Sequence, residues 1–202
     1  MIQVICVDIS SAEDEIYRML YEKASAQRKC RADRYLRQED QLRCVTAEAL
    51  LRCILGVTED QIEKTSLGKP YIKTRKDVFY NLSHSGRYVV LAWGGTEVGV
   101  DVQQHDPATD REAIETLFFA PDERCYACGD IGRFYEIWTK KESYLKYTGK
   151  GLRTDLRSFS VLSPERKIRF FCRTLDEDHS LSLCTEEKEY AFELLDIQRL
   201  LS

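Results

Sequence analysis

The sequence contains no apolar run that approaches the roughly 18 residues of a transmembrane helix. Its N-terminal stretch shows neither a basic segment nor a cleavage motif, so we expect no signal peptide and a cytoplasmic protein. Positive charge is not in excess: 30 Lys and Arg stand against 34 Asp and Glu, for a net charge of −4. This balance argues against nucleic-acid binding driven by net charge. No Pro/Gly/Ser-rich linker divides the 202 residues, which suffice for a sizeable core.

Histidine is also scarce, with three residues, whereas there are eight cysteines. Only Cys125 and Cys128 are close in sequence, and neither a second CxxC pair nor a histidine at ligand spacing accompanies them. We therefore expect reduced thiols and no zinc site. A redox role for Cys125 and Cys128 remains an alternative, although the pair lies in an acidic, helix-like stretch rather than in a βαβ setting.

The apolar periodicity predicts alternating helices and strands, and hence an α/β fold. Ser10 and Glu13 resemble a capping box that opens a helix, and Gly94-Gly95 is typical of a hairpin turn. A basic stretch runs from Arg28 to Arg43, and residues 68–70 form a turn. The predicted strands are 2–9, 78–82, 88–93, 98–102, 157–162, 167–172, 181–184 and 189–195, and the predicted helices are 10–23, 39–55, 111–119 and 122–147, the last interrupted near Gly129.

Two predicted strands resemble each other, since residues 5–9 read Ile-Cys-Val-Asp-Ile and residues 98–102 read Val-Gly-Val-Asp-Val. This similarity is compatible with two similar α/β halves, and a chance match between two buried strands explains it equally well.

Glu142 and Lys146 are the first candidates for chemistry. They lie four residues apart on the predicted helix, at the edge of an apolar stripe formed by Phe134, Ile137, Trp138 and Leu145. That position suits the wall of a cleft, and an ordinary surface Glu/Lys pair is the competing interpretation.

Asp101 and Gln103 lie on one face of a predicted strand, where Gly99 permits close approach of another segment. Carboxylates are typical magnesium ligands, and Asp101 and Glu142 would make a pair if the fold brought them together. An Asp that merely ends a strand is the alternative.

Ser83 and His84 follow a strand and precede a small, polar turn, which suits a phosphate cradle. We do not expect a hydrolase, because adjacent strand residues point apart and the sequence shows no nucleophile elbow. Lys69, in Gly68-Lys69-Pro70, lacks the rest of a P-loop but is able to contact a phosphate. The basic stretch is either a solvated helix face or a landing site for a phosphorylated ligand.

Taken in order, the motifs G-K-P, N-L-S-H-S-G, V-G-V-D-V and W-x-x-K-E-S-x-x-K-x-x-G-x-G-L resemble those of the 4′-phosphopantetheinyl transferases of the surfactin-synthetase-activating type. The resemblance implies two similar α/β halves, residues 1–97 and 98–202, related by a pseudo-two-fold axis with the active site between them. It also implies transfer of phosphopantetheine from coenzyme A to a serine of an acyl or peptidyl carrier protein, with Mg (or Mn) as cofactor and adenosine 3′,5′-bisphosphate as product. A monomer that binds neither nucleic acid nor membranes is expected.

The resemblance also implies roles for individual residues. Asp101, Gln103 and Glu142 would hold the metal, Glu142 would act as general base, and Lys146 would stabilise charge on the pyrophosphate. The residues expected to contact coenzyme A are Arg28, Arg31, Arg43, Lys69, Pro70, Ser83 and His84.

Four positions depart from the family pattern. Gln103 stands where glutamate is frequent, Arg28 and Arg31 stand where lysines are common, and Cys44 stands where relatives can have a hydroxyl. Gln103 motivates a second hypothesis, a coenzyme A- or carrier-binding protein with weak or lost transferase activity.

Overall fold

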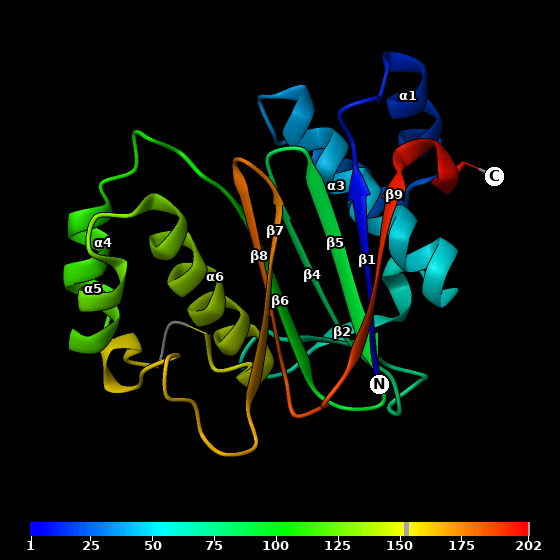
Figure 1. The fold of residues 1–202 in the computed structure, drawn as a ribbon. Helices are drawn as coiled ribbons and strands as arrows, with labels where there is room; N and C mark the ends of the chain where they lie inside the picture. Colours follow the sequence, from blue (N-terminus) through cyan, green and yellow to red (C-terminus); the bar gives the residue numbers. More distant parts are fainter. Residues whose placement is uncertain (152–153, 202) are drawn as a thin grey trace.

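The computed structural model describes residues 1–151 and 154–201. Its strands form three sheets, which Figure 1 shows in chain colours. The first sheet has the order β4 (Phe79–Ser85), β5 (Tyr88–Gly94), β1 (Ile2–Asp8) and β9 (Tyr190–Asp196). The second has the order β6 (Val98–Gln104), β8 (His179–Thr185) and β7 (Arg169–Asp176). A small hairpin joins β2 (Ile62–Lys64) and β3 (Pro70–Ile72).

Helices cover the outer faces of both sheets (Figure 1). The first sheet packs against α1 (Asp14–Lys23), α2 (Ala26–Ala32) and α3 (Gln38–Leu50), which a π-helical turn extends over Leu51–Leu55. On the far side lie α4 (Arg111–Phe118), α5 (Pro121–Ala127) and α6 (Ile131–Thr148). Short 3-10 helices span Glu59–Gln61, Leu156–Ser158 and Ile197–Leu200.

The side-chain alternation of the strands explains this layering. Val4 and Val90 point from the first sheet toward Val100 and Leu183 of the second, and together they form a buried core between the sheets. The opposite side chains of β1 and β5, such as Val7, pack on the helices α1 and α3. The fold is therefore α/β, as predicted.

The two sheets repeat one strand order. In each sheet the chain begins with one strand, β1 or β6, and then forms helices. A hairpin follows, β4-β5 or β7-β8. The second strand of this hairpin pairs with the strand that began the sheet, which gives the orders β4-β5-β1 and β7-β8-β6. β9 then crosses back from the end of the chain and pairs in parallel with β1. A repeated order is what two similar halves require, while the symmetry axis and the boundary at residue 97 stay predictions.

Most predicted elements are confirmed, with four corrections. No capping box opens α1: the helix begins at Asp14, and Asp8 Oδ1 accepts a hydrogen bond from the Ser10 backbone at 2.9 Å, which holds residues 10–11 in a turn. Gly94-Gly95 is no hairpin turn, because β5 and β6 belong to different sheets and this connection crosses between them. The sequence pattern could not distinguish a crossing from a hairpin of equal length.

The other two corrections concern a helix and a strand. Part of the basic stretch forms α2, which sequence reasoning left unassigned, with the Ser25 hydroxyl accepting a hydrogen bond from the Arg28 backbone at 3.1 Å. Residues 157–162 form no strand: Asp155 caps a 3-10 turn by accepting from the Arg157 backbone at 3.0 Å. Leu152, the last residue of the final sequence motif, lies outside the described residues.

Candidate active site

Helix α6 lies directly against β6 because Gly99 has no side chain. A Cβ atom at this position would stand 2.0 Å from the Ser143 carbonyl oxygen and 2.4 Å from the Tyr147 backbone nitrogen. This close approach brings Glu142 and Lys146, on one side of α6, to the strand that carries Asp101.

Asp101 is the centre of a buried polar network. One carboxylate oxygen accepts hydrogen bonds from Lys146 Nζ at 2.6 Å and from Ser83 Oγ at 3.0 Å. The other oxygen accepts from the Gln103 side-chain amide at 3.1 Å, and Lys146 also contacts Ser83 at 2.9 Å. Only 2% of Asp101 is exposed. The structure thus brings together residues from β4, β6 and α6 that are far apart in sequence.

A row of side chains on β4 joins the two sheets at this point. Asn81, Ser83 and Ser85 accept hydrogen bonds from the backbone amides of residues 100, 102 and 104 of β6, at 2.9, 3.2 and 2.9 Å. Sequence reasoning missed Asn81 and Ser85. Their alternation with Ser83 was the available signal, because every second residue of a strand shares a face.

Glu142 lies beside this network with an altered proton affinity. Burial raises the pKa of its carboxyl group, the negative charge of Asp101 raises it further, and Lys146 partly offsets both. A carboxylate with a raised pKa is a better proton acceptor than an exposed one.

The oxygen-rich donor set fits a hard divalent cation. Asp101 and Glu142 supply two carboxylates, the ligand type that such cations prefer. Among the described residues no group of three or more His, Cys, Asp and Glu is gathered for a metal. A metal ion at Asp101 and Glu142 would therefore need the side-chain amide oxygen of Gln103 as its third protein ligand.

Lys69 and Pro70 lie at the C-terminal end of α6, beside Glu142 and Lys146. They line a cavity of about 240 Å³ together with Asn81, Glu142 and Lys146. The Lys69 ammonium group donates to the Tyr147 carbonyl at 2.7 Å and pairs with Glu97. These contacts place Lys69 beside the predicted catalytic pair.

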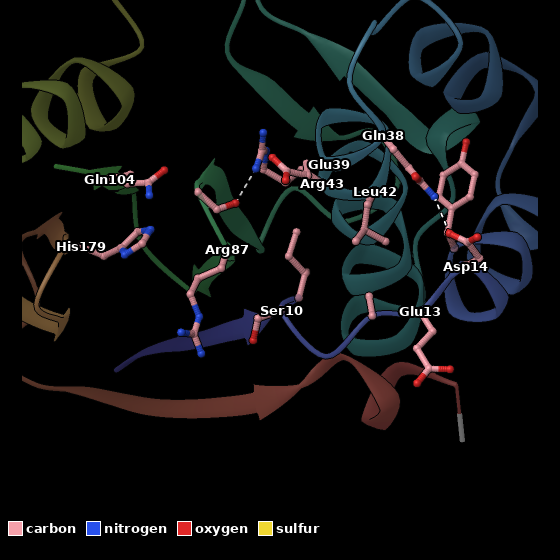
Figure 2. Close-up of a pocket in the computed structure, with 14 residues that line it drawn as sticks. Ser10, Glu13, Asp14, Gln38, Glu39, Leu42, Arg43, Arg87, Gln104 and His179 are labelled. Atoms are coloured by element: carbon pink, nitrogen blue, oxygen red, sulfur yellow. Dashed lines mark hydrogen bonds between the residues drawn. The ribbon is translucent and has the colours of Figure 1, made fainter. Parts of the chain in front are cut away.

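His84 points away from Ser83, on the opposite face of β4, as strand alternation requires. Desolvation lowers the pKa of its imidazole, and the positive charges of Arg43 and Lys146 lower it further. Arg43 donates to the Gly86 carbonyl and pairs with Asp40 at 2.6 Å. Figure 2 shows Arg43 on the wall of a cavity of about 440 Å³ that extends toward Gln104 and His179.

Arg28 and Arg31 form a separate cluster on α2. Glu59 bridges them, with one carboxylate oxygen on Arg28 and the other 3.2 Å from Arg31. Glu48 approaches Arg28 from the other side at 3.6 Å. Cys44 faces this cluster: burial raises the pKa of its thiol, while Arg28 and Arg31 act in the opposite direction. Glu48 and Glu59 were not anticipated from sequence.

The eight cysteines are free thiols. Cys125 lies on the short helix α5 and Cys128 caps its end in a left-handed conformation, with φ of 42°. No strand flanks this helix on either side, so the βαβ setting of a thioredoxin-like motif is absent from this part of the structure.

Two family models match the chain. One, described as "4'-phosphopantetheinyl transferase superfamily", covers residues 97–195, and the other, "4'-phosphopantetheinyl transferase, N-terminal", covers residues 11–95. Together they cover the chain from α1 into β9 and the network between the sheets, and only β1 precedes the matched residues. None of the helices in the described part of the chain is long and apolar enough to cross a membrane.

Curated relatives agree with these matches. A 4'-phosphopantetheinyl transferase of Bacillus subtilis is 30% identical over 203 residues, covering 89% of either chain. The 4'-phosphopantetheinyl transferase Sfp of Bacillus subtilis (strain 168) is 31% identical over 165 residues, covering 76% of this chain and 71% of the relative. The chain belongs to the 4′-phosphopantetheinyl transferase superfamily. Its enzyme class is therefore the phosphopantetheinyl transferases, and the resemblance inferred from the sequence motifs is confirmed.

Proposed function

We propose that this protein transfers the 4′-phosphopantetheine group from coenzyme A to a serine of an acyl or peptidyl carrier protein and releases adenosine 3′,5′-bisphosphate. The observation that carries the proposal is the network in which Asp101 binds Lys146 and Ser83 beside Glu142. It combines a buried carboxylate, a half-buried one and the ammonium group of Lys146 at the junction of two sheets. That combination suits phosphoryl transfer, in which charge stabilisation and positioning supply most of the catalysis.

Coenzyme A would lie across the two sheets. Lys69 and Pro70 would line the adenine and phosphate region of coenzyme A. Ser83 and His84 would contact the pyrophosphate. The 3′-phosphate side would face Arg28, Arg31 and Arg43. Support comes from the cavity that Lys69 and Pro70 share with Glu142 and Lys146, and from the positive charges of Arg43 and Lys146, which add to the desolvation that lowers the pKa of His84.

Asp101, Glu142 and the amide oxygen of Gln103 would hold a magnesium ion, and manganese has the same preference for oxygen ligands. Such an ion would neutralise charge on the pyrophosphate. In the transfer itself, Glu142 would accept the proton of the carrier serine hydroxyl as the serine oxygen attacks the phosphorus that bears pantetheine. The bond from this phosphorus to the bridging oxygen breaks, and its electron pair leaves with adenosine 3′,5′-bisphosphate. Lys146 would stabilise the developing charge.

A titration of turnover against Mg²⁺ and Mn²⁺, with coenzyme A and several apo carrier proteins, tests the proposal. We expect transfer that saturates with metal and vanishes in chelator. Absence of turnover at every concentration of either metal, with coenzyme A bound, would instead favour the binding protein without transferase activity. Gln103 motivates that second candidate.

Gln103→Glu sharpens the distinction. It would place a third carboxylate beside Asp101, so the concentration of Mg²⁺ for half-maximal turnover should stay equal or fall. Because like charges would then crowd the empty site, the variant should also melt at a lower temperature in chelator and recover with Mg²⁺. A sharp rise in the required concentration of Mg²⁺ would show that Gln103 has another role. The monomeric state and the cytoplasmic location stay predictions.

A further inference from the structure

The cluster around Arg28 and Arg31 is electrically balanced before any ligand arrives. Two guanidinium groups face two carboxylates, because Glu59 bridges both arginines and Glu48 stands beside Arg28. The Glu59 side chain is 10% exposed, and that of Arg28 is 8% exposed. Water therefore screens the Arg28–Glu59 pair only weakly, whereas the Arg31 side chain is 47% exposed and its pair with Glu59 is screened more.

Glu59 occupies the position that a phosphate would need. A carboxylate that receives N–H groups from two arginines, one at each oxygen, makes the same charge-assisted contacts as two oxygens of a phosphate. Glu48 cannot leave as easily, since its oxygens also accept hydrogen bonds from the Ser25 backbone at 3.0 Å and the Ser25 hydroxyl at 3.1 Å. Glu59 belongs to a short 3-10 helix that ends at Gln61. A local movement of this turn would therefore be enough to withdraw the Glu59 carboxylate from the two arginines.

We infer that Glu59 is a specificity-determining residue that competes with the 3′-phosphate of the nucleotide for Arg28 and Arg31. This inference rests on the proposed function, which assigns the 3′-phosphate to these arginines. A ligand that carries the phosphate must displace Glu59, whereas a ligand without it leaves the ion pairs intact. The residue thus weakens binding of the substrate and of the departing adenosine 3′,5′-bisphosphate, and it favours product release.

The test is calorimetric binding of two nucleotides to the full chain. Adenosine 3′,5′-bisphosphate carries the 3′-phosphate, and adenosine 5′-monophosphate lacks it. Glu59→Gln removes the competing charge with little change of shape, so the bisphosphate should bind at least about fivefold more tightly. Binding of the monophosphate should stay within about twofold. In turnover, product inhibition by the bisphosphate should strengthen by the same factor.

Asp60→Asn is the matched control, because it removes one negative charge from the next residue of the same turn, which is exposed. It should leave the ratio of the two affinities unchanged. Glu59→Ser, prepared in parallel, should repeat the effect of Glu59→Gln, and circular dichroism should show both variants folded at the temperature of the binding experiment.

The possible results distinguish a failure of the inference about Glu59 from a failure of the proposed coenzyme A site. In one outcome the wild type binds the bisphosphate and Glu59→Gln binds it equally well or more weakly. This outcome would overturn the inference about Glu59 and leave the proposed function standing. Bisphosphate binding by none of the proteins would overturn both the inference and the assignment of the coenzyme A site. If both Glu59 variants failed to fold, Glu59 would be a structural counter-ion, and the inference would again be overturned.

Discussion

At the scale of single residues, Glu142 and Asp101 differ in how their carboxylates are held. Asp101 is bound by three donors, whereas the pKa of Glu142 is raised by burial and by the charge of Asp101. One carboxylate is thus held in place, and the other has an increased affinity for a proton. Sequence alone indicated that both residues matter. It could not show this division, which depends on neighbours from β4.

Glu142→Gln should lower kcat by at least about 100-fold, since glutamine cannot accept the serine proton. The fold should remain intact because Glu142 flanks the buried stripe of α6 and its charge is only partly compensated. Steady-state kinetics and thermal melting measure the two effects. Glu136→Gln, on the same helix but paired with Lys140, serves as a control and should keep normal turnover. Normal turnover by Glu142→Gln would refute its assignment as the base.

The raised pKa of Glu142 also predicts a pH dependence of stability. The folded state holds this proton more tightly than the unfolded state, so ionisation of Glu142 costs stability as pH rises from the ordinary value near about 4.3 through the raised value. The free energy of unfolding of the wild type, minus that of Glu142→Gln, should therefore decrease across this range and then level off. Urea unfolding in metal-free buffer measures it, and a difference that stayed constant or increased would contradict the assigned direction.

At the scale of elements, the site depends on how closely α6 lies on β6. Gly99 makes this possible, and a methyl group there would meet the helix backbone at 2.0 Å. Gly99→Ala should therefore displace α6, lower stability by about 1–3 kcal/mol and reduce turnover. Gly95→Ala is the matched control, because no atom lies within 4 Å of a Cβ built at Gly95. Equal stability and activity of the two variants in chemical unfolding and kinetics would disprove the close-packing argument.

Helix α6 is also tied to α5 by a fully buried ion pair. Lys141 Nζ lies 2.8 Å from Glu123 and donates to the Leu156 carbonyl at 2.6 Å, and neither side chain of the pair is exposed. Burial lowers the pKa of the Lys141 ammonium group, which Glu123 partly offsets. This pair was not anticipated, because the sequence does not show which charges become buried.

Lys141→Met should destabilise the protein by about 3 kcal/mol or more, since it leaves Glu123 charged and uncompensated in the core. Lys140→Met, at the adjacent position, breaks a helical i,i+4 pair with Glu136 and should cost less than about 1 kcal/mol. Chemical unfolding of both variants gives the comparison, and similar losses would mean that the buried pair contributes no more than the outer one.

Sequence patterns predicted elements better than their connections. The strands of the central core were visible as apolar runs, and the motif on α6 was visible as a helical stripe. The pairing of β9 with β1 and the crossing at Gly94-Gly95 were not visible, because they depend on contacts between segments far apart in the chain. The bounds of α2 were not predicted, because the sequence showed its basic residues only as a solvated helix face or a phosphate-binding stretch. Their ion pairs with Glu48 and Glu59 depend on residues further along the chain.

At the scale of the molecule, the candidate site exists only because two sheets meet. Asn81, Ser83 and Ser85 of one sheet bind the backbone of the other, and Asp101 and Lys146 close on Ser83 from the second half. Residues 5–8 lie in β1 and residues 98–102 lie in β6, the corresponding first strands of the repeated order, while the pseudo-two-fold relation stays a prediction. Neither sheet carries the complete network, so we predict a single catalytic unit built from both.

Intact-mass measurement of an apo carrier protein, after incubation with this protein, coenzyme A and Mg²⁺, tests the central claim most directly. We predict a mass gain of one phosphopantetheine on the carrier serine, absent when metal is omitted and absent with Glu142→Gln. An unchanged carrier mass across fatty-acid, polyketide and peptide carriers, with coenzyme A bound to the protein, would contradict the account.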